Sequence, residues 1–216
     1  SSEPLTDLFW TPADCAWIGC LFDVLLPAWH FGIPVVSHRS QKFDPEFTFD
    51  LISKLNIQNT FLPPTALKMM KSFNPSSTKY KLNLRTIGSG GEALGEDLLE
   101  WGKRILGVNI NEFYGQTECN LTISNSSAVM PTKQGSIGKP VPGQEVRIMN
   151  KRGEFIKEPG VDGEIVVNYN TPVAFLKYWE NDKETQNKVI NGWLHTGDFA
   201  FRDDEGYFYF KGREDD

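Results

Sequence analysis

The chain has few cysteines, and their spacing excludes the two structures that cysteines commonly build. Its 216 residues include three of them, Cys15, Cys20 and Cys119. An odd and sparse set matches neither the paired spacing of a zinc site nor a framework of disulfides. We therefore expect free thiols and a reducing, cytoplasmic location.

Long apolar runs and an excess of positive charge are also missing. The longest apolar stretch, roughly residues 13–36, is interrupted by acidic residues, proline, histidine and glycine. It is therefore a poor transmembrane helix and no signal peptide, and we expect no membrane span. The net charge of −6 argues against a nucleic-acid partner, because phosphate backbones are bound by clustered Lys and Arg. A small anionic ligand, held by backbone amides and a few local charges, remains compatible with it.

The first part of the chain alternates helical and extended patterns. This alternation predicts an α/β fold with a mostly parallel sheet and packed helices, whose ligands bind at the carboxyl ends of strands. The expected strands are 33–36, 59–62, 84–87 and 108–113. A first helix is expected to start at 11–14, and three further helices are expected at 44–55, 63–73 and 94–106.

The pattern changes after about residue 130, where turn residues become frequent. Four short strands follow, at 144–149, 163–168, 193–202 and 206–211, with a hairpin turn at 203–206 and a helix at 181–190. Asn181 and Glu184 have the spacing of a capping box at the start of that helix. We expect an α/β subdomain at 1–130 and a smaller β-rich subdomain, a distorted barrel, at 131–216.

Three runs carry residues suited to nucleotide chemistry, and each has a plain structural alternative. Gly88, Gly90 and Ala93 fit the G-x-G-x-x-A pattern of NAD-binding folds, with Glu112 as a ribose-binding acid. A tight turn without a ligand is the alternative. In the run 114–118, an aromatic ring can stack on a purine, a Thr hydroxyl can donate to phosphate and a Glu carboxylate suits magnesium. An ordinary turn with a capping Thr is the alternative here.

The third run surrounds Asp198, which follows a glycine within a predicted strand. Its carboxylate can accept hydrogen bonds from ribose hydroxyls, and Arg213 can add donors. A turn aspartate and a surface arginine are the alternatives. No partner carboxylate is implied for His195, so we interpret it as structural. The pattern likewise indicates that Trp17 and Phe22 belong to the core.

Together these runs resemble the adenylate-forming superfamily, which includes acyl-CoA synthetases, luciferases and peptide-synthetase adenylation domains. The resemblance covers essentially the whole chain, in blocks at 10–14, 90–94, 114–118, 163–165, 193–198 and 206–215. Gln116 and Glu112 are most similar to medium-chain acyl-CoA synthetases, with acetyl-CoA synthetases close by. The resemblance implies an AMP-forming acid–thiol ligase, whose substrates are a small carboxylic acid, ATP and coenzyme A, with Mg²⁺.

The resemblance also implies roles for particular residues. Thr117 and Glu118 would be catalytic, with Glu118 holding the magnesium ion, and Asp215 would be the hinge to a C-terminal domain. The implied nucleotide-binding set is Gly91, Glu92, Ala93, Glu112, Phe113, Tyr114, Gly115, Gln116, Thr117, Asp198 and Arg213. The implied acyl pocket is Trp17, Ile18, Gly19, Gly90 and Gly115.

The size of the acid follows from the glycines of that pocket. In acetyl-specific members a large indole occupies the position of Gly115, whereas glycine at 19, 90 and 115 leaves space for an acyl group larger than acetyl. The family's phosphate loop and its C-terminal domain lie outside this chain, which begins without Met, so we expect an inactive piece of a longer protein. An adenylation domain that loads a carrier protein, a non-catalytic nucleotide binder and an NAD-binding domain remain alternatives, and the oligomeric state is open.

Overall fold

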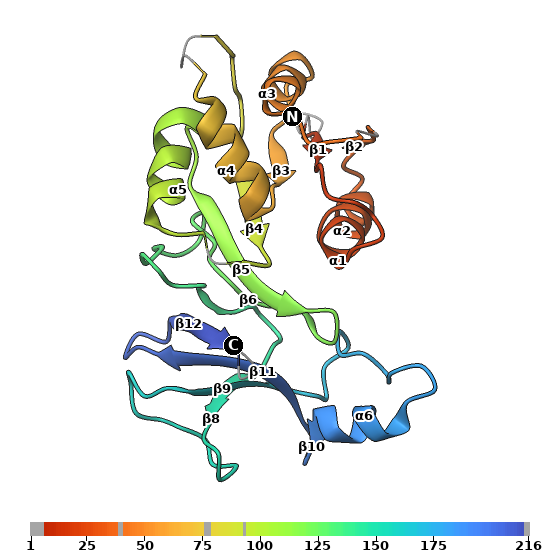
Figure 1. Ribbon diagram of the computed structural model, residues 1–216, viewed down its shortest axis with the longest axis vertical. Coiled ribbons are helices and arrows are strands. Elements are labelled where there is room, and N and C mark those ends of the chain that lie inside the picture. Colours follow the sequence, from red (N-terminus) through yellow and green to blue (C-terminus); the bar gives the residue numbers. More distant parts are fainter. Residues whose placement is uncertain (1–6, 39–40, 76–78, 93, 214–216) are drawn as a thin grey trace, which may run out of the picture. The chain divides into compact units, whose positions relative to one another are not determined.

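The chain is described here from a computed structural model, which describes residues 7–38, 41–75, 79–92 and 94–213. It divides into two compact units, residues 1–111 and 112–216. Figure 1 labels the helices and strands of both units. Ala93 and Asp215, which the resemblance assigns to the adenine site and the hinge, lie outside the described residues.

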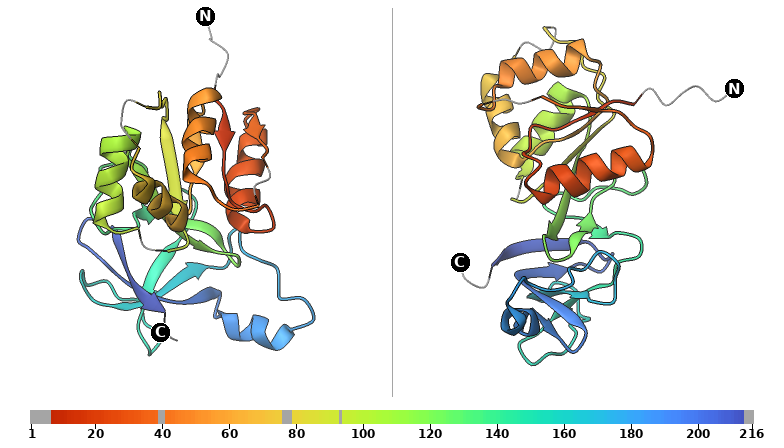
Figure 2. Two further views of the ribbon diagram at one scale, coloured as in Figure 1. Left: turned by 45° about the horizontal axis from the view of Figure 1, so that its top comes forward. Right: turned by 90° about the vertical axis from the view of Figure 1, so that its right-hand side faces the viewer.

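The first unit is built on a parallel sheet, as its alternating pattern predicts. The strands lie in the order β2-β1-β3-β4, and each pair is parallel. Helices flank the strands (Figure 2). The strands are β1 (Phe9–Trp10), β2 (Val35–Val36), β3 (Asn59–Phe61) and β4 (Thr86–Gly90), and β5 (Ile110–Gln116) begins at the end of the unit. The helices are α1 (Ile18–Cys20), η1 (Leu21–Leu25), α2 (Leu26–His30), α3 (Pro45–Lys54), α4 (Pro64–Phe73), α5 (Glu96–Trp101) and η2 (Gly102–Leu106).

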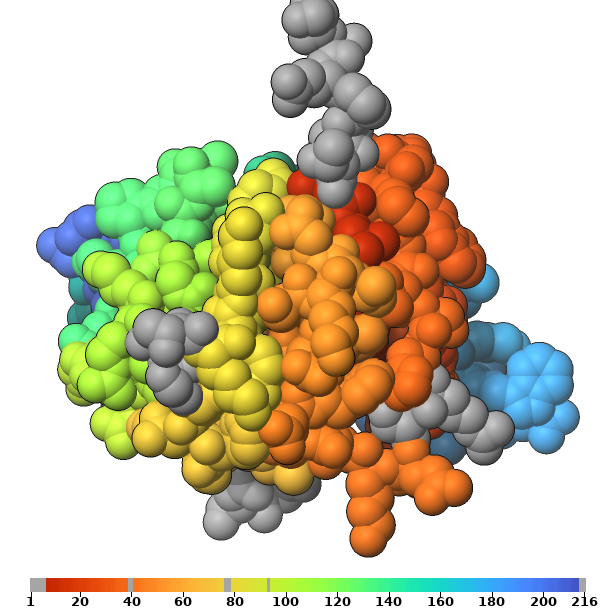
Figure 3. Space-filling view, turned by 90° about the horizontal axis from the view of Figure 1, so that it is seen from above, coloured from red at the N-terminus to blue at the C-terminus, as the bar shows by residue number. Residues whose placement is uncertain are grey.

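Helices α3 and α4 begin at start signals in the sequence, a capping aspartate for α3 and a proline for both. The Asp44 carboxylate accepts a hydrogen bond from the Phe47 amide at 3.2 Å, which satisfies one of the free donors in the first turn. Proline occupies the first helical position of both helices, where its missing N–H costs nothing. Figure 3 shows the surface of the first unit from above, in a space-filling view. The buried faces of the helices pack with the strands in one apolar core that includes Phe49, Ile52, Leu67, Met70, Ile87 and Trp101.

The first helix begins later than the sequence predicts. Residues 11–14 are irregular and lead into a turn at 14–17. The Thr11 side chain accepts from the Ala13 amide at 3.1 Å, and the Asp14 carboxylate accepts from the Ala16 amide at 2.8 Å. Short polar side chains of this kind compete with helix formation by bonding the nearby backbone. The helix therefore begins at Ile18.

The expectation of free thiols is wrong for two of the three cysteines. Cys15 and Cys20 form a disulfide, with their Cα atoms 4.7 Å apart across five positions of sequence. The turn that precedes α1 brings these residues together, which spacing alone did not reveal. Cys119 is free and buried, and burial raises the pKa of its thiol to about 11.

The glycine cluster belongs to a strand for most of its length. β4 extends through Gly90, with Gly88 paired to Phe61, and the Ser89 hydroxyl donates to the carbonyl of Leu62 at 2.7 Å. The turn expected at 88–92 therefore begins at Gly91, whose φ of +96° suits glycine.

The second unit is antiparallel and β-rich. Its first part consists of β5, β6 (Asn120–Ser124) and β7 (Lys139–Pro140). Its second part is a curled half-barrel sheet in the order β10-β11-β9-β8, with β12 paired to β11. These strands are β8 (Val146–Met149), β9 (Gly163–Asn168), β10 (Val189–Ile190), β11 (Trp193–Arg202) and β12 (Phe208–Arg213). The four strands predicted here are confirmed, with small shifts at their ends.

Local signals in this unit also act as predicted. Helix α6 (Asp182–Lys188) is capped by the Asn181 side chain, which accepts from the Glu184 amide at 3.2 Å. At the predicted hairpin turn, the Asp203 carboxylate accepts from the amides of Glu205 at 3.0 Å and Tyr207 at 2.8 Å. Asp203 therefore closes the β11–β12 hairpin in the way turn aspartates commonly do.

The hairpin of β5 and β6 was not predicted. Tyr114, Gly115 and Gln116 lie inside β5 rather than after it. Side chains of this hairpin, including Tyr114 and Ile123, pack in the second core with residues such as Val146 and Ile165. The compact units therefore divide at residue 111, earlier than the change of pattern near 130. Compact units of this kind do not define domain borders. The predicted domains at 1–130 and 131–216 therefore stay a prediction.

Gly138 provides a test of this packing. Its φ is +100°, and an added Cβ would lie 2.1 Å from the carbonyl carbon and oxygen of Ser124. We expect Gly138→Ala to lower the free energy of unfolding by about 3–5 kcal/mol, because backbone strain and overpacking add. The matched control is Gly206→Ala, where φ is +88° but no atom lies within 4 Å, and there we expect a loss of about 1–2 kcal/mol. Urea unfolding of both variants is the measurement, and equal losses would contradict the close contact.

Candidate nucleotide site

The candidate site in the second unit is centred on a buried carboxylate. Asp198 lies on β11 and is 4% exposed. Its Oδ2 accepts a hydrogen bond from the Tyr114 hydroxyl at 2.6 Å and another from the Gln116 amide. Its Oδ1 lies 3.5 Å from Nη1 of Arg213, the residue opposite Asp198 in the β11–β12 pair. Four predicted site residues are thus brought together.

Tyr114 is held as a hydrogen-bond donor. Tyr114 is 9% exposed, and the centroid of its ring lies 6.2 Å from the centroid of the Phe210 ring. Burial raises the pKa of its hydroxyl well above 10.0, and the neighbouring Asp198 charge raises it further. Little of the ring is open to a purine in this arrangement, so its role as a stacking surface stays a prediction.

Gln116 leaves one acceptor for a ligand. Its amide nitrogen donates both to Asp198 and to the carbonyl of Thr196, the latter at 2.9 Å. Its Oε1 is buried and has no hydrogen-bond partner among the described residues. Unpaired buried acceptors are costly, and a ribose hydroxyl would satisfy this one. Gln116 therefore fits the nucleotide that the sequence implies.

Thr117 and Glu118 lie in the turn that follows β5. Thr117 is exposed and Glu118 is half-buried. One carboxylate oxygen of Glu118 accepts from the Tyr178 hydroxyl at 2.6 Å, and burial together with this carboxylate raises the pKa of that hydroxyl. No group of three metal-binding side chains occurs among the described residues. A single carboxylate nevertheless fits magnesium, which commonly takes one or two carboxylates and completes its shell with substrate phosphates and water.

The other predicted nucleotide residues are placed separately. Glu112 is buried, and its carbonyl accepts from the Asn125 amide at 2.8 Å. Phe113 pairs with Ser124 across the β5–β6 hairpin. In the first unit, Gly91 and Glu92 occupy the exposed turn after β4, where the Glu92 carboxylate lies 3.6 Å from Nζ of Lys68. What these residues bind stays a prediction.

The NAD-binding alternative receives no support from the turn after β4. Gly88 and Gly90 lie in the strand, and α5 begins only at Glu96, with Gly95 as its N-cap. A dinucleotide fingerprint needs its glycines in a tight turn that leads directly into the helix, since the pyrophosphate rests on the helix N-terminus.

The structure corrects the core interpretation of two aromatic residues near the first helix, while the acyl-pocket assignment stays a prediction. Trp17 is 72% exposed and Phe22 is 48% exposed, so the expectation that they are core residues is wrong. Ile18 is half-buried. A Cβ at Gly19 would lie 2.8 Å from the ring of Phe61. The glycine allows this ring to pack closely, and it does not leave empty space.

Gly115 also has a structural reason to be glycine. A Cβ at this position would lie 2.0 Å from the carbonyl oxygen of Asn120. The β5–β6 register shifts here, since Tyr114 pairs with Ile123 and Gly115 with Leu121, which leaves Thr122 as an extra residue. The bulge gives the missing side chain a packing reason, and the role of Gly115 in an acyl pocket stays a prediction. Gly90 is buried at the end of β4.

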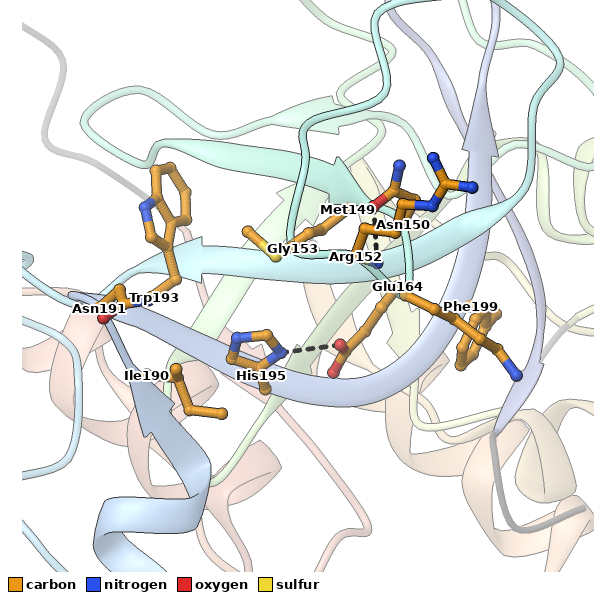
Figure 4. Close-up of a pocket in the computed structure, with 11 residues that line it drawn as sticks. Met149, Asn150, Arg152, Gly153, Glu164, Ile190, Asn191, Trp193, His195 and Phe199 are labelled. Carbon is orange, nitrogen blue, oxygen red and sulfur yellow. Dashed lines mark hydrogen bonds and ion pairs between the residues drawn. The ribbon is translucent and has the colours of Figure 1, made fainter.

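The sequence did not predict a second polar pair, His195 and Glu164. The interpretation that His195 has no partner carboxylate is wrong, because its Nδ1 lies 2.8 Å from Oε2 of Glu164. Glu164 lies on β9, and a predicted strand alone does not give the register that pairs it with β11. Figure 4 shows the pair among the residues that line a cavity. The volume of this cavity is about 650 Å³. The cavity is lined by residues of four strands, β8 to β11, and two turns, among them Met149, Arg152, Ile190, Trp193 and Phe199.

The pattern of the AMP-binding enzyme family matches residues 1–179 of the chain. This chain belongs to the AMP-binding enzyme family. The resemblance of its motifs to adenylate-forming enzymes is thereby confirmed. In the part of the chain that the structure describes, no helix combines the length and apolar character needed to cross a membrane.

Curated relatives and solved structures agree with this assignment. The chain is 31% identical to the acetyl-coenzyme A synthetase of Bacillus subtilis, over 97% of this chain and 37% of the relative. It is 32% identical to a mitochondrial acyl-coenzyme A synthetase of Rattus norvegicus, over 98% and 37%. A crystal structure of a Brucella canis acyl-CoA synthetase superposes with a TM-score of 0.88 at 28% identity, over 99% of this chain and 39% of that one. The chain thus spans about 37% of the length of the curated relatives.

Replacing Tyr114 tests the geometry around Asp198. We expect Tyr114→Phe to lower the free energy of unfolding at pH 7 by about 1.5–3 kcal/mol, because a hydrogen bond to a charged group is lost. The folded pKa of Tyr114 is raised above 10.0, so its contribution is complete below pH 10 and disappears as pH rises through the folded value. The wild type should therefore lose stability above pH 10 more steeply than the variant does.

Urea unfolding between pH 7 and 11 measures both effects. Tyr207→Phe is the matched control, because it removes a hydroxyl whose acceptor is the uncharged carbonyl of Pro131, at 2.6 Å. Identical alkaline profiles for the wild type and Tyr114→Phe would contradict the assignment.

Proposed function

We propose that this chain forms the nucleotide-binding part of an AMP-forming acyl-CoA synthetase. In this reaction a carboxylate oxygen attacks the α-phosphate of ATP, which yields an acyl-adenylate and pyrophosphate. The thiol of coenzyme A then attacks the acyl carbon, and AMP leaves. The observation that carries the proposal is the buried Asp198 carboxylate, oriented by Tyr114 and Gln116 beside Arg213. Family membership and the acyl-CoA synthetases among the relatives support it.

Each residue of the proposed site has a role suited to its chemistry. The free lone pairs of Asp198 and the Oε1 of Gln116 accept from the ribose hydroxyls, and Arg213 supplies donors. Thr117 donates to the α-phosphate, and Glu118 ligates the Mg²⁺ that neutralises phosphate charge. Gly91, Glu92 and Ala93 form the adenine site, and Asp215 is the hinge. No side chain acts as a covalent nucleophile, since positioning and charge neutralisation account for the catalysis.

We further propose that the acid is larger than acetate and that the protein is cytoplasmic. Support for the size is the glycine at 115, where acetyl-specific members of the superfamily carry an indole.

Substrate preference tests the size of the acid. A longer protein that contains this chain should use butyrate in preference to acetate, with kcat/KM rising about fourfold for each added methylene, since each buried methylene contributes about 0.8 kcal/mol. A steady-state series from acetate to octanoate measures this. A preference for acetate would contradict the proposal of a larger acid and leave the reaction class intact.

Nucleotide binding tests the proposed site itself. Calorimetry of this chain with a non-hydrolysable acyl-adenylate analogue should show binding that Asp198→Asn weakens by at least about tenfold, because the variant loses a charged acceptor. Asp204→Asn, at an exposed turn of the same hairpin, is the control and should bind as the wild type does. Equal affinity in Asp198→Asn would refute the assignment. We expect no pyrophosphate release from ATP and an acid by this chain alone, and robust release would overturn that expectation.

A further inference from the structure

We infer that Glu164 is a positioning residue for Asp198, acting through the backbone of β11. The connection is a hydrogen bond from the Gly197 amide to Oε1 of Glu164, at 2.9 Å. Gly197 directly precedes Asp198, so the orientation of the Gly197 peptide affects the direction of the Asp198 side chain. The structural part of this inference stands alone, and its consequence for catalysis rests on the proposed function.

The strand β11 is irregular where it presents Asp198. His195 pairs with Val166 of β9, and the next pair is Phe199 with Glu164. Three residues of β11, 196–198, therefore lie opposite the single residue Ile165. Such bulges re-aim side chains and disrupt the ladder of hydrogen bonds locally. Gly197 adopts a φ of +75° within the bulge, a conformation that favours glycine.

Side chains replace the hydrogen bonds that the bulge removes from the ladder. The Asp198 amide donates to Oγ1 of Thr196 at 3.1 Å, and that hydroxyl donates to the carbonyl of Ile165 at 2.6 Å. The Thr196 carbonyl accepts from Gln116 at 2.9 Å and from Lys188 at 3.1 Å. The Gly197 amide has the Glu164 carboxylate as its acceptor. Glu164 thus completes the pairing of the backbone next to Asp198.

His195 fixes the position of this acceptor. Figure 4 shows the Glu164 side chain reaching from β9 toward the His195 ring, where a dashed line marks their contact. The two side chains are 20% and 22% exposed. One carboxylate oxygen of Glu164 faces the ring and the other faces Gly197. With both oxygens engaged, the rotamer of Glu164 is determined, and so is the direction in which the Gly197 amide points.

Removal of the Glu164 carboxylate should therefore affect the peptide that carries the Gly197 amide. Without this acceptor, the Gly197 amide must find another partner, and the bulge can relax toward a regular register. Asp198 would then rotate away from Tyr114 and Gln116. Small displacements of groups that hold a substrate cost up to about a hundredfold in rate or affinity. A glutamine at 164 keeps an oxygen acceptor for Gly197, and its NH₂ group can donate to Nδ1 of the other His195 tautomer.

The first readout is amide hydrogen exchange by NMR on this chain without ligand. We expect Glu164→Ala to speed exchange at Gly197 by at least about tenfold, with little change at residues of β8. Glu164→Gln should stay within about threefold of the wild type. The matched control is Glu145→Ala, which removes a carboxylate that bonds Asn168 and Arg147 elsewhere on the same sheet and should leave Gly197 unchanged.

The second readout is affinity for the acyl-adenylate analogue. Glu164→Ala should weaken binding by about 10–100-fold, whereas Glu164→Gln and Glu145→Ala should bind as the wild type does. The inference is overturned if Gly197 exchange is unchanged in Glu164→Ala, if Glu164→Gln fails to restore it, or if Glu145→Ala produces the same losses. If the exchange results appear as expected but the wild type binds no analogue, the proposed function fails while Glu164 remains the residue that positions Asp198.

Discussion

The structure of the second unit depends on satisfying one buried carboxylate. Asp198 is too deeply buried to rely on water, and an uncompensated charge at such a depth is strongly destabilising. Its partners come from β5, which is 84 residues away in sequence for Tyr114, and from β12, the other strand of its own hairpin, and its backbone is held by β9. The hairpin β5–β6, the bulge in β11 and the pairing of β11 with β12 are therefore linked requirements. Removing any one of them leaves a polar group of this site without its partner.

Features governed by local chemistry could be predicted from the sequence. The caps at Asp44 and Asn181 and the hairpin turn at Asp203 follow from short-range rules, and each is observed. The parallel order of the first unit follows from its alternating pattern. Of the site, the identities of Tyr114, Gln116, Asp198 and Arg213 came from motif resemblance, and their meeting around a single carboxylate required the fold.

Features governed by register could not be predicted. A strand pattern states which residues are extended, but not which residue of the neighbour lies opposite. The partnership of Glu164 with His195, the extra residue Thr122 and the three-residue bulge at 196–198 all depend on that information. The predicted helix start at 11–14 was wrong for a different reason, because the Thr11 and Asp14 side chains accept from the nearby amides of Ala13 and Ala16 instead of starting a helix.

The close approach of Gly115 to Asn120 has a consequence for how the sequence of this hairpin can change. A larger residue at 115 cannot be introduced alone, because the backbone of the opposite strand occupies its place. A change there must be accompanied by a rearrangement of residues 120–122, which means that substitutions in the two strands are epistatic. The unit of exchange between relatives is then the whole hairpin, residues 113–124, transferred as a cassette that carries its own register.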